Sequence, residues 1–473
     1  MLENYEPKKV LHYFEEMTTI PHCSGNEATY SNYLVNFAKE HGLEVHQDDH
    51  YNVIIKKPGT KGKEDLAPVI IQGHMDMVCV KEDDLEFDFD TMALPIYVDG
   101  DFLKSKGTTL GGDNGIAVAM ALAILDSDEL EHPPLEVLIT TEEEVGLLGA
   151  AALQGEHLQG ETLINLDSEE EGVFLASCCG GVRNFIDIPV EYQDNPHKHS
   201  YKLRIFGLKG GHSGMEINTH RASANKLLAR VLLQLEVEIG FLEGGEKMNS
   251  IAKQAIAHVS SASDLTEHLQ ELEETFKKEY AGTDDEIEIS VEALDSLEKV
   301  FTEESKKRVL AALQVVPQGV QAMSQHMEGL VETSSNFGVL SSTEEAVRIE
   351  SSHRSSVESK KQDLVMLFEA IATLSGGKTH TQGDYPGWEF VPESAIRDLF
   401  VEVYEELSGE QAKVEAIHAG LECGVIQDCI GRDLDMVSLG PNMAEVHTPN
   451  ERLSLSSVKR TYDLVVEVLR RIR

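Results

Sequence analysis

Hydrophobic residues in the first forty positions recur with the spacing of amphipathic helices. Each predicted helix presents apolar side chains three or four residues apart: Val10, Tyr13, Phe14 and Met17 in one, then Tyr30, Tyr33, Leu34 and Phe37 in the next. Pro7 is placed to begin the first of these helices. Gly42 is placed to end the second, because glycine tolerates the backbone conformation that closes a helix.

Short runs of apolar residues then predict β-strands that stop at polar residues. These runs cover residues 53–55, 68–71, 135–141 and 162–166. Helical stretches separate the last three runs, which favours a largely parallel sheet with helices on its faces. Because ligands of such sheets bind beyond the carboxyl ends of the strands, we expect functional residues just after these runs.

Histidine and carboxylate residues occupy those positions. His74 and Asp76 follow the second run, Glu143 and Glu144 follow the third, and Asp167 follows the fourth. Residues two apart on an extended chain point to the same side, so His74 and Asp76 can face one site. The pair suits a metal-ligand histidine beside an acid, although His-x-Asp also occurs by chance.

A glycine-rich loop and an acidic run each admit a simpler interpretation. Asp113 stands between glycines just before an alanine-rich helix at residues 116–125, where it could merely cap that helix. Three consecutive carboxylates at residues 142–144 repel one another and are typical of an exposed loop. Only the gathering of these acids and His74 at one edge of the predicted sheet favours a functional site.

The hydrophobic pattern changes near Tyr192 and changes back after residues 386–388. Between these points it predicts strands at residues 199–208, 286–291, 336–340 and 346–351, and helices at 227–235, 264–280, 306–314 and 359–375. Afterwards it predicts helices at 396–407 and at the C-terminus, with strands at 414–417 and 434–439. We therefore predict a catalytic α/β domain in two parts, residues 1–191 and 389–473, interrupted by an α+β domain at 192–388.

Composition narrows the classes of partner and compartment. The chain has 473 residues, 41% hydrophobic and 26% charged, which is typical of a folded soluble protein. With 83 acidic and 40 basic residues its formal charge is −43, which disfavours nucleic acid and anionic membranes as partners. Neither a secretory signal nor a membrane span is visible, so we expect a cytoplasmic protein. The six cysteines form no CxxC pair, so we expect buried free thiols rather than disulfides or a thiolate zinc site.

Several motifs, in this order, make the sequence resemble the co-catalytic zinc peptidases related to aminoacylase and bacterial carboxypeptidases. They are His74-Met75-Asp76, Gly112-Asp113-Asn114-Gly115, Glu143-Glu144-x-Gly146, Asn165-Leu166-Asp167-Ser168, Gly210-Gly211-His212-Ser213-Gly214 and a late His447. More narrowly, residues 106–111, 167–172, 207–214, 385–388 and 417–424 resemble the bacterial aminoacyl-histidine dipeptidases. This resemblance spans almost the whole chain. It implies a mostly parallel-sheet dinuclear metallopeptidase domain with an inserted lid or dimerisation domain.

The resemblance also implies a set of metal ligands. Asp113 would bridge two divalent metal ions, with His74 and Asp167 completing one site and Glu144 and His447 completing the other. One histidine and carboxylates for each metal suit catalytic zinc, and manganese or cobalt can use the same ligands.

Two further carboxylates have implied roles beside the metals. Asp76 would orient a metal-binding imidazole, and Glu143 would be the general base that takes a proton from the attacking water. Glu142 adds a third carboxylate before the expected pair. We anchor the assignment of Glu143 and Glu144 on Gly146.

Five residues are implied in substrate binding. His212 would donate to the oxyanion, from the same chain or from a partner subunit, and Asn249 and Arg354 would bind the C-terminal carboxylate. His418 and Glu422 would line the pocket. Without the resemblance, His212 would be interpreted as a turn residue and Arg354 as part of a surface ion pair.

The expected function is therefore metal-dependent hydrolysis of dipeptides with a C-terminal histidine, including β-alanyl-histidine. A tripeptide aminopeptidase, a carboxypeptidase and an aminoacylase are the alternatives within the same superfamily. A catalytically silent metal-binding regulatory protein is the non-enzymatic alternative, but the presence of Glu143 beside all five ligands argues against it. The expected partner is a small peptide substrate, and the sequence leaves a homodimer open.

Overall fold

A computed structural model describes residues 1–473, and the chain divides into two compact units. The first unit comprises Met1–Cys178, Phe390–Ala416 and Leu421–Arg473. The second comprises Cys179–Glu389 and the short segment Ile417–Gly420. The chain therefore passes from one unit to the other four times.

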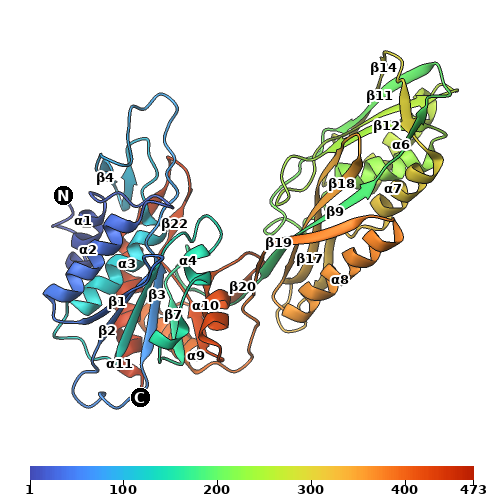
Figure 1. Cartoon of the computed structure of the whole chain (residues 1–473). Helices are drawn as coiled ribbons and strands as arrows, with labels where there is room; N and C mark the ends of the chain where they lie inside the picture. The colour runs from blue at the N-terminus through green and yellow to red at the C-terminus, as the bar shows by residue number, and fades with distance from the viewer. The chain divides into compact units, whose positions relative to one another are not determined.

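The first unit is built on an eight-stranded sheet whose central strands are parallel (Figure 1). In sheet order the strands are β1 (Glu44–Gln47), β2 (Val53–Lys57), β6 (Leu135–Thr140), β3 (Val69–His74), β7 (Thr162–Asn165), β21 (Asp435–Ser438), β8 (Val173–Cys178) and β20 (Lys413–Ile417). Strands β6, β3, β7 and β21 pair in parallel, whereas β1 and β2 are antiparallel additions at one edge. The predicted parallel sheet is thus confirmed at its centre.

Helices and a small second sheet complete the first unit. The helices are α1 (Lys8–Met17), α2 (Ala28–Glu40), α3 (Gly112–Leu125), α4 (Leu148–Ala151), the 3-10 turn η1 (Gly155–His157), α9 (Ala395–Ser408), α10 (Glu422–Ile430) and α11 (Leu455–Arg471). Helix α3 is buried almost all round, which its alanine-rich sequence allows because small side chains let α1 and β3 approach closely. A four-stranded sheet joins β22 (Met443–Ala444), β23 (Arg452–Ser454), β5 (Phe102–Ser105) and β4 (Ile96–Asp99).

The second unit is an α+β domain on a large antiparallel sheet (Figure 1). Its main strands run in the order β14 (Glu288–Leu294), β11 (His199–Phe206), β13 (Ala255–Ser261), β12 (Glu238–Gly244), β17 (Val331–Ser342), β18 (Ala346–Ser355), β9 (Gly180–Pro189) and β19 (Lys378–Tyr385), with β16 (Gly319–Met323) paired to β17. Strands β10 (Tyr192–Asp194) and β15 (Lys299–Phe301) form a separate pair. Helices α5 (Ala224–Gln234), α6 (Thr266–Glu279), α7 (Glu303–Val315) and α8 (Glu358–Leu374) share the sheet's hydrophobic core.

No helix of the protein combines the length and the apolar character needed to cross a membrane.

The second unit begins earlier than the change of pattern near Tyr192 predicts. It starts at Cys179, because β9 pairs along its length with β18 and β19 of the second unit. Val182, Ile186 and Ile188 alternate as buried residues in β9, so this strand belongs to the antiparallel sheet. Because β9 follows β8 directly, no change of pattern in the sequence marks the boundary between the units.

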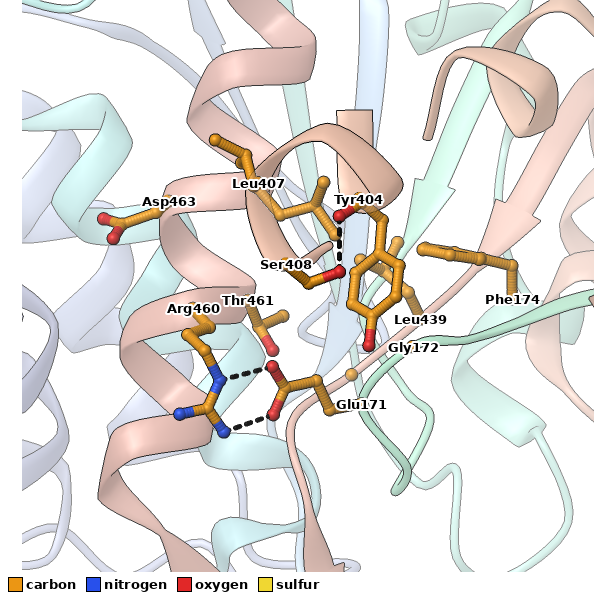
Figure 2. Close-up of a pocket in the computed structure, with 12 residues that line it drawn as sticks. Glu171, Gly172, Phe174, Tyr404, Leu407, Ser408, Leu439, Arg460, Thr461 and Asp463 are labelled. Carbon is orange, nitrogen blue, oxygen red and sulfur yellow. Dashed lines mark hydrogen bonds and ion pairs between the residues drawn. The ribbon is translucent and has the colours of Figure 1, made fainter. Parts of the chain in front are cut away.

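A cavity of about 180 Å³ lies in the first unit beside α9 and α11 (Figure 2). Its walls are formed by Glu171, Gly172, Phe174, Tyr404, Leu407, Ser408, Leu439, Gly440, Arg460, Thr461, Asp463 and Leu464. The Arg460 guanidinium donates to both carboxylate oxygens of Glu171 at 2.6 Å, so these two charges neutralise each other at the cavity. None of the residues predicted to bind metal or substrate lines this cavity.

Candidate metal centre

Asp113 lies where the glycine-rich loop enters α3, and its two carboxylate oxygens face different histidines. Asp113 Oδ1 is 3.2 Å from His74 Nε2, and Asp113 Oδ2 is 3.1 Å from His447 Nε2. Its backbone is not helical at φ −85° and ψ 107°, and its side chain does not cap the helix. The simpler interpretation of Asp113 as a helix cap therefore does not describe this structure.

Two more carboxylates complete the cluster around these histidines. His74 Nε2 lies 3.4 Å from Asp167 Oδ1, and His447 Nε2 lies 2.8 Å from Glu144 Oε1. His74 ends β3, while Asp167 and Glu144 follow β7 and β6, so three of the five side chains come from carboxyl ends of parallel strands. The structure thus joins the five predicted ligands in two groups that share Asp113.

Hydrogen bonds within the cluster favour positive charge at both imidazoles. Asp113 and Glu144 raise the pKa of His447 to about 10. Burial opposes protonation of His74, but Asp167 and Asp113 outweigh it and hold the pKa of His74 well above its usual value. Burial likewise opposes ionisation of Asp113, yet the two histidines hold its pKa below the usual range. The cluster is therefore arranged to accommodate cationic charge.

The donor atoms of the cluster fit a transition-metal ion. The ligand atoms of His74, Asp113 and Glu144 all lie within 4.8 Å of one another. Imidazole nitrogen together with carboxylate oxygen is a donor set that zinc, manganese and cobalt accept. The residues present can hold an ion of this class.

Asp76 connects the histidine to the acidic run that follows β6. His74 Nδ1 is 2.9 Å from the Asp76 carbonyl oxygen and 3.4 Å from its Oδ1. The backbone N–H groups of Glu143 and Glu144 donate to the two Asp76 carboxylate oxygens at 3.0 and 3.3 Å. The Ser24 hydroxyl donates to the same carboxylate at 2.8 Å. Asp76 thus holds His74 with its Nε2 toward the cluster and fixes the backbone of the two glutamates.

The acidic run enters the cluster in the predicted register. Glu144 reaches His447, whereas Glu142 adopts a left-handed backbone at φ 49°. Burial raises the pKa of Glu143 well above its usual value, and the nearby charge of Asp167 adds to this rise. Glu143 is therefore a half-buried carboxyl group beside the cluster rather than part of a fully exposed acidic loop.

Two buried residues beside the cluster are absent from the predicted site. Asn114 Oδ1 accepts the His74 backbone N–H at 3.1 Å, and Asn114 Nδ2 donates to the Leu166 carbonyl at 2.8 Å. Glu451 accepts backbone N–H groups of residues 110–113. The available signals were the position of Asn114 next to Asp113 and the position of Glu451 four residues after the predicted ligand His447.

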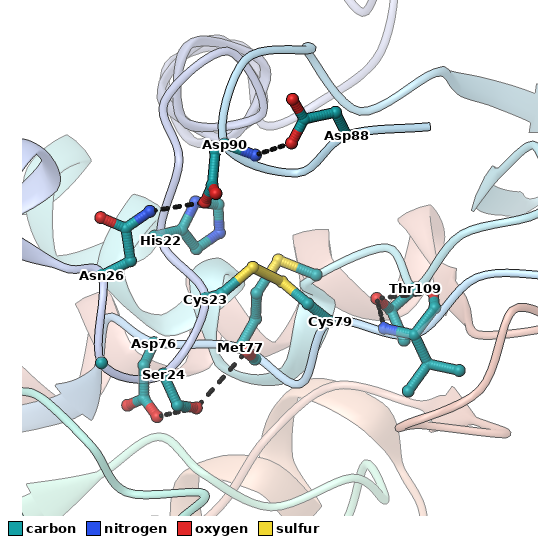
Figure 3. Close-up of a disulfide and its surroundings, with 12 residues drawn as sticks. His22, Cys23, Ser24, Asn26, Asp76, Met77, Cys79, Asp88, Asp90 and Thr109 are labelled. Atoms are coloured by element: carbon teal, nitrogen blue, oxygen red, sulfur yellow. Dashed lines mark hydrogen bonds between the residues drawn. A yellow bond between two sulfur atoms is a disulfide. The ribbon is translucent and has the colours of Figure 1, made fainter. Parts of the chain in front are cut away.

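A disulfide lies beside Asp76, which corrects the expectation that all cysteines are free (Figure 3). Cys23 and Cys79 have Cα atoms 5.6 Å apart, although 56 positions separate them in the sequence. Met77 N donates to the His22 carbonyl at 3.1 Å, and this backbone pairing brings the two segments together. The remaining four cysteines form no disulfide: Cys178, Cys179, Cys423 and Cys429.

His212, in the second unit, is held in one tautomer. Its Nδ1 accepts the backbone N–H groups of Gly214 and Met215 at 3.3 and 3.2 Å. Burial and the positive charge of Arg354 lower the pKa of His212. A neutral imidazole that accepts at Nδ1 carries its proton on Nε2, so His212 can act as a hydrogen-bond donor.

The other substrate-binding candidates of the second unit gather near His212. The Asn249 carbonyl accepts the Ser213 backbone N–H at 2.9 Å. A Cβ at Gly214 would lie only 2.6 Å from the His418 carbonyl oxygen, so these two segments are in contact. Burial lowers the pKa of His418 to about 3, and the Arg354 charge contributes to this shift.

Arg354 does not form the surface ion pair that its sequence context alone would suggest. Its Nη1 lies 4.0 Å from the Cys179 thiol, and its Nε is buried without a hydrogen-bond partner. Coulombic attraction to Tyr385 and Cys179 raises the guanidinium pKa against the effect of burial. The Nε group of Arg354 therefore has no hydrogen-bond partner within the protein.

Glu422 has a different environment from the other substrate-binding candidates. It lies in the first unit at the start of α10 and is fully buried. Its Oε2 accepts Gln72 Nε2 at 2.6 Å and Thr140 Oγ1 at 2.7 Å, while Gln72 Oε1 accepts Asn165 Nδ2 at 2.6 Å. Burial raises its pKa to about 8. In this structure Glu422 joins β3 to β6, Gln72 extends the network to β7, and Glu422 exposes no surface to a ligand.

Comparison with known proteins identifies the family of this chain. Residues 70–471 match the model of peptidase family M20/M25/M40. The chain belongs to this family. The match to M20/M25/M40 confirms the resemblance seen in the motifs and makes the protein a hydrolase of the peptidase class.

Named relatives match the chain over nearly its full length. The cytosol non-specific dipeptidase of Escherichia coli is 36% identical over 480 residues, covering 100% of this chain and 99% of the relative. The crystal structure of aminoacylhistidine dipeptidase from Vibrio alginolyticus matches with a TM-score of 0.94 and 35% identity, covering 100% of this chain and 98% of that one. Aminopeptidase PepT of Bacillus cereus matches with a TM-score of 0.58 and 17% identity over 98% of both chains, which shows a shared fold. These matches confirm the predicted fold class.

Proposed function

We propose that this protein is a metal-dependent dipeptidase that prefers a C-terminal histidine, with β-alanyl-histidine among its substrates. The observation that carries the proposal is the Asp113 carboxylate, shared between the His74–Asp167 pair and the His447–Glu144 pair. The two full-length relatives support the substrate class, since one is named a non-specific dipeptidase and the other an aminoacylhistidine dipeptidase.

Two divalent metal ions, most suitably zinc, belong to this proposal. His74 and Asp167 would hold one ion, Glu144 and His447 the other, and Asp113 would contribute to both. Bound ions of this kind supply Lewis-acid polarisation of the scissile carbonyl and of a nucleophilic water at neutral pH.

Glu143 is the proposed general base. Its carboxylate takes a proton from the attacking water and later returns it to the leaving amine. Asp76 supports this role because it accepts the Glu143 backbone N–H at 3.0 Å while it also orients His74. Asp76 therefore sets the position of the base through its carboxylate and that of a ligand through its backbone carbonyl.

The second unit would recognise and polarise the peptide. His212 donates its Nε2 proton to the oxyanion that develops on the scissile carbonyl, and the two backbone N–H groups that donate to its Nδ1 support this role. Arg354 and Asn249 bind the substrate's C-terminal carboxylate, and His418 lines the same pocket. The unpartnered Arg354 Nε supports this assignment, because a guanidinium fork pairs with a carboxylate through two N–H groups. His212 acts in this way whether it comes from the same chain or from a second copy in a homodimer.

Four substrates test the proposal: alanyl-histidine, β-alanyl-histidine, alanyl-alanine and an acetylated amino acid, each with and without a chelator. We expect chelator-sensitive hydrolysis of the first two at higher kcat/KM than the others. Equal rates for alanyl-histidine and alanyl-alanine would favour a broad dipeptidase like the Escherichia coli relative. Hydrolysis of the acetylated amino acid alone would favour an aminoacylase, and turnover of none would contradict the enzymatic proposal.

A cytoplasmic location accompanies the proposed function. The name of the Escherichia coli relative as a cytosol enzyme supports it. Because reducing compartments keep most cysteines as thiols, the state of Cys23 and Cys79 is informative. Cell fractionation, combined with thiol alkylation under denaturing conditions, would measure both the location and the redox state.

A further inference from the structure

The N-terminus of α3 has no capping side chain of its own. Its N-cap residue is Gly111, which has a left-handed backbone at φ 70°. The first N–H groups of a helix lack partners within the helix and normally receive them from a nearby side chain. Asp113 is close enough in sequence to serve, but its carboxylate is directed to His74 and His447 instead. Another acceptor must therefore satisfy these N–H groups.

Glu451 supplies that acceptor from a distant part of the sequence. Its Oε2 accepts Leu110 N at 2.7 Å and Gly111 N at 3.2 Å. Its Oε1 accepts Gly112 N at 2.8 Å and Asp113 N at 3.3 Å. A carboxylate offers about four lone-pair positions, so one side chain binds four successive backbone donors. Glu451 is 3% exposed, which keeps water from competing for these hydrogen bonds.

The same residue is tied to the segment that carries His447. Glu451 N donates to the Thr448 carbonyl at 3.1 Å, closing a turn directly after the histidine. Asp113 and His447 lie 334 positions apart in the sequence, yet Glu451 binds the backbone next to both. Gly112 permits the close approach, because a Cβ there would lie 3.1 Å from Glu451 Oε1.

We propose that Glu451 is a positioning residue for the metal centre, which holds the backbone of residues 110–113 and fixes Asp113 relative to His447. This inference rests on the proposed function, because it gives Asp113 and His447 their task as ligands. Glu451 acts through backbone N–H groups and touches neither the reacting atoms nor the substrate.

Glu451→Gln and Glu136→Gln form a matched pair of variants. Glu136 is also buried in the first unit and accepts the backbone N–H groups of Gln159 and Gly160 at 2.8 and 2.9 Å. Both substitutions keep the size of the side chain and remove a negative acceptor. Only Glu451 binds a loop that carries a predicted ligand. Glu451→Asp retains the charge but shortens the reach.

The first measurement is amide hydrogen exchange on the metal-free protein. We expect faster exchange at residues 110–113 in Glu451→Gln, with no such change in Glu136→Gln. This readout requires neither bound metal nor activity. Unchanged protection at residues 110–113 would overturn the proposed contact whatever the protein's function.

The second measurement is calorimetric titration of metal-free protein with Zn²⁺. For Glu451→Gln we expect zinc affinity about 10–100-fold weaker than wild type, the range seen when a supporting partner of a ligand is lost. We expect Glu136→Gln to bind like wild type and Glu451→Asp to lie between. Dipeptide turnover by Glu451→Gln should recover as Zn²⁺ is raised, with KM little changed.

The outcomes separate this inference from the proposed function. Wild-type zinc affinity in Glu451→Gln, with residues 110–113 deprotected, would overturn the positioning role. Equal weakening in both Gln variants would also overturn it, because the effect would then be a general loss of stability. If wild-type protein binds no zinc, manganese or cobalt, the metal centre itself fails, and the exchange result still decides whether Glu451 holds the loop.

Discussion

The predicted metal-binding side chains and the predicted substrate-binding side chains are held in different ways. In the first unit, Asp76 fixes His74 and Glu451 holds the loop of Asp113. In the second unit, Nε of the predicted substrate-binding residue Arg354 is buried without a hydrogen-bond partner. Buried polar groups normally have hydrogen-bond partners. The predicted substrate-binding side chains therefore retain a hydrogen-bond donor without a partner, whereas the predicted metal-binding side chains do not.

This difference matches two kinds of ligand. An ion that stays bound requires ligands fixed in advance by surrounding hydrogen bonds. A substrate that arrives and leaves must find donors that are not already satisfied within the protein. Changes in the first unit should therefore alter ion binding or the rate of reaction, and changes in the second should spare ion binding.

Glu143→Gln should produce the largest loss of activity. The amide cannot accept a proton from water, so kcat should fall by about 10²–10⁴-fold. The variant should still bind two metal ions, because Glu143 is not one of the proposed ligands. Steady-state kinetics and metal analysis measure both quantities. Full activity with two ions bound would refute the role of Glu143 as base.

His212→Ala should produce the second-largest loss of activity. Loss of one donor to the oxyanion should lower kcat by about 10²–10³-fold. Zinc affinity should stay at the wild-type value, since His212 belongs to the second unit. His212→Gln, which keeps an N–H donor, serves as the comparison. A weaker zinc affinity in His212→Ala would break the contrast between the units.

Arg354→Lys should give a smaller effect that falls mainly on KM. Lysine lacks the planar fork for a carboxylate, and a charge-assisted hydrogen bond contributes about 1.5–3 kcal/mol, so kcat/KM should fall by roughly 10–100-fold. Arg348→Lys is the matched control, because Arg348 lies on the same strand and pairs with Asp187 at the surface. Equal losses in both variants would remove the case for Arg354 as the carboxylate-binding residue.

The double variant Cys23→Ser, Cys79→Ser should have the smallest effect on turnover and a clear effect on stability. The disulfide closes a loop of 56 residues, so its removal should lower the free energy of unfolding by about 4 kcal/mol in the chain-entropy model. Denaturant unfolding measures this change, and reductant should destabilise wild type equally. Cys429→Ser, at a free cysteine, is the control. Unchanged stability in the double variant would mean that the cysteines are unpaired in solution.

The sequence predicted the features that depend on local patterns. Apolar runs marked β3, β6 and β7, and the parallel arrangement then placed His74, Glu144 and Asp167 at one edge of the sheet. Alternating and helical periodicities also located the four helices of the second unit and its strands β11, β14, β17 and β18, but they missed β9, β12, β13, β16 and β19. These inferences succeed because each strand or helix carries its own signature within about ten residues.

Features made by contacts between distant segments were not predictable. Glu451 follows His447 closely, but only the fold reveals that its carboxylate binds residues 110–113. The pairing of Cys23 with Cys79 required the backbone contact beside Met77, which no spacing rule provides. The burial of Glu422 likewise depends on Gln72 and Thr140 from two separate strands.

Because the chain passes between the units four times, neither a single proteolytic cut nor a single deletion separates them cleanly. A protease that cuts only at the Glu389–Phe390 junction leaves each unit joined to the other through the remaining passages. Removal of Cys179–Glu389 from the gene would leave Ile417–Gly420 without its hydrogen-bond partners Ser334 and Cys179. Most of the second unit is one continuous segment, which makes it resemble a separable domain. A second short segment of the chain nevertheless belongs to it as well. Exchange of specificity between relatives would have to carry both segments together.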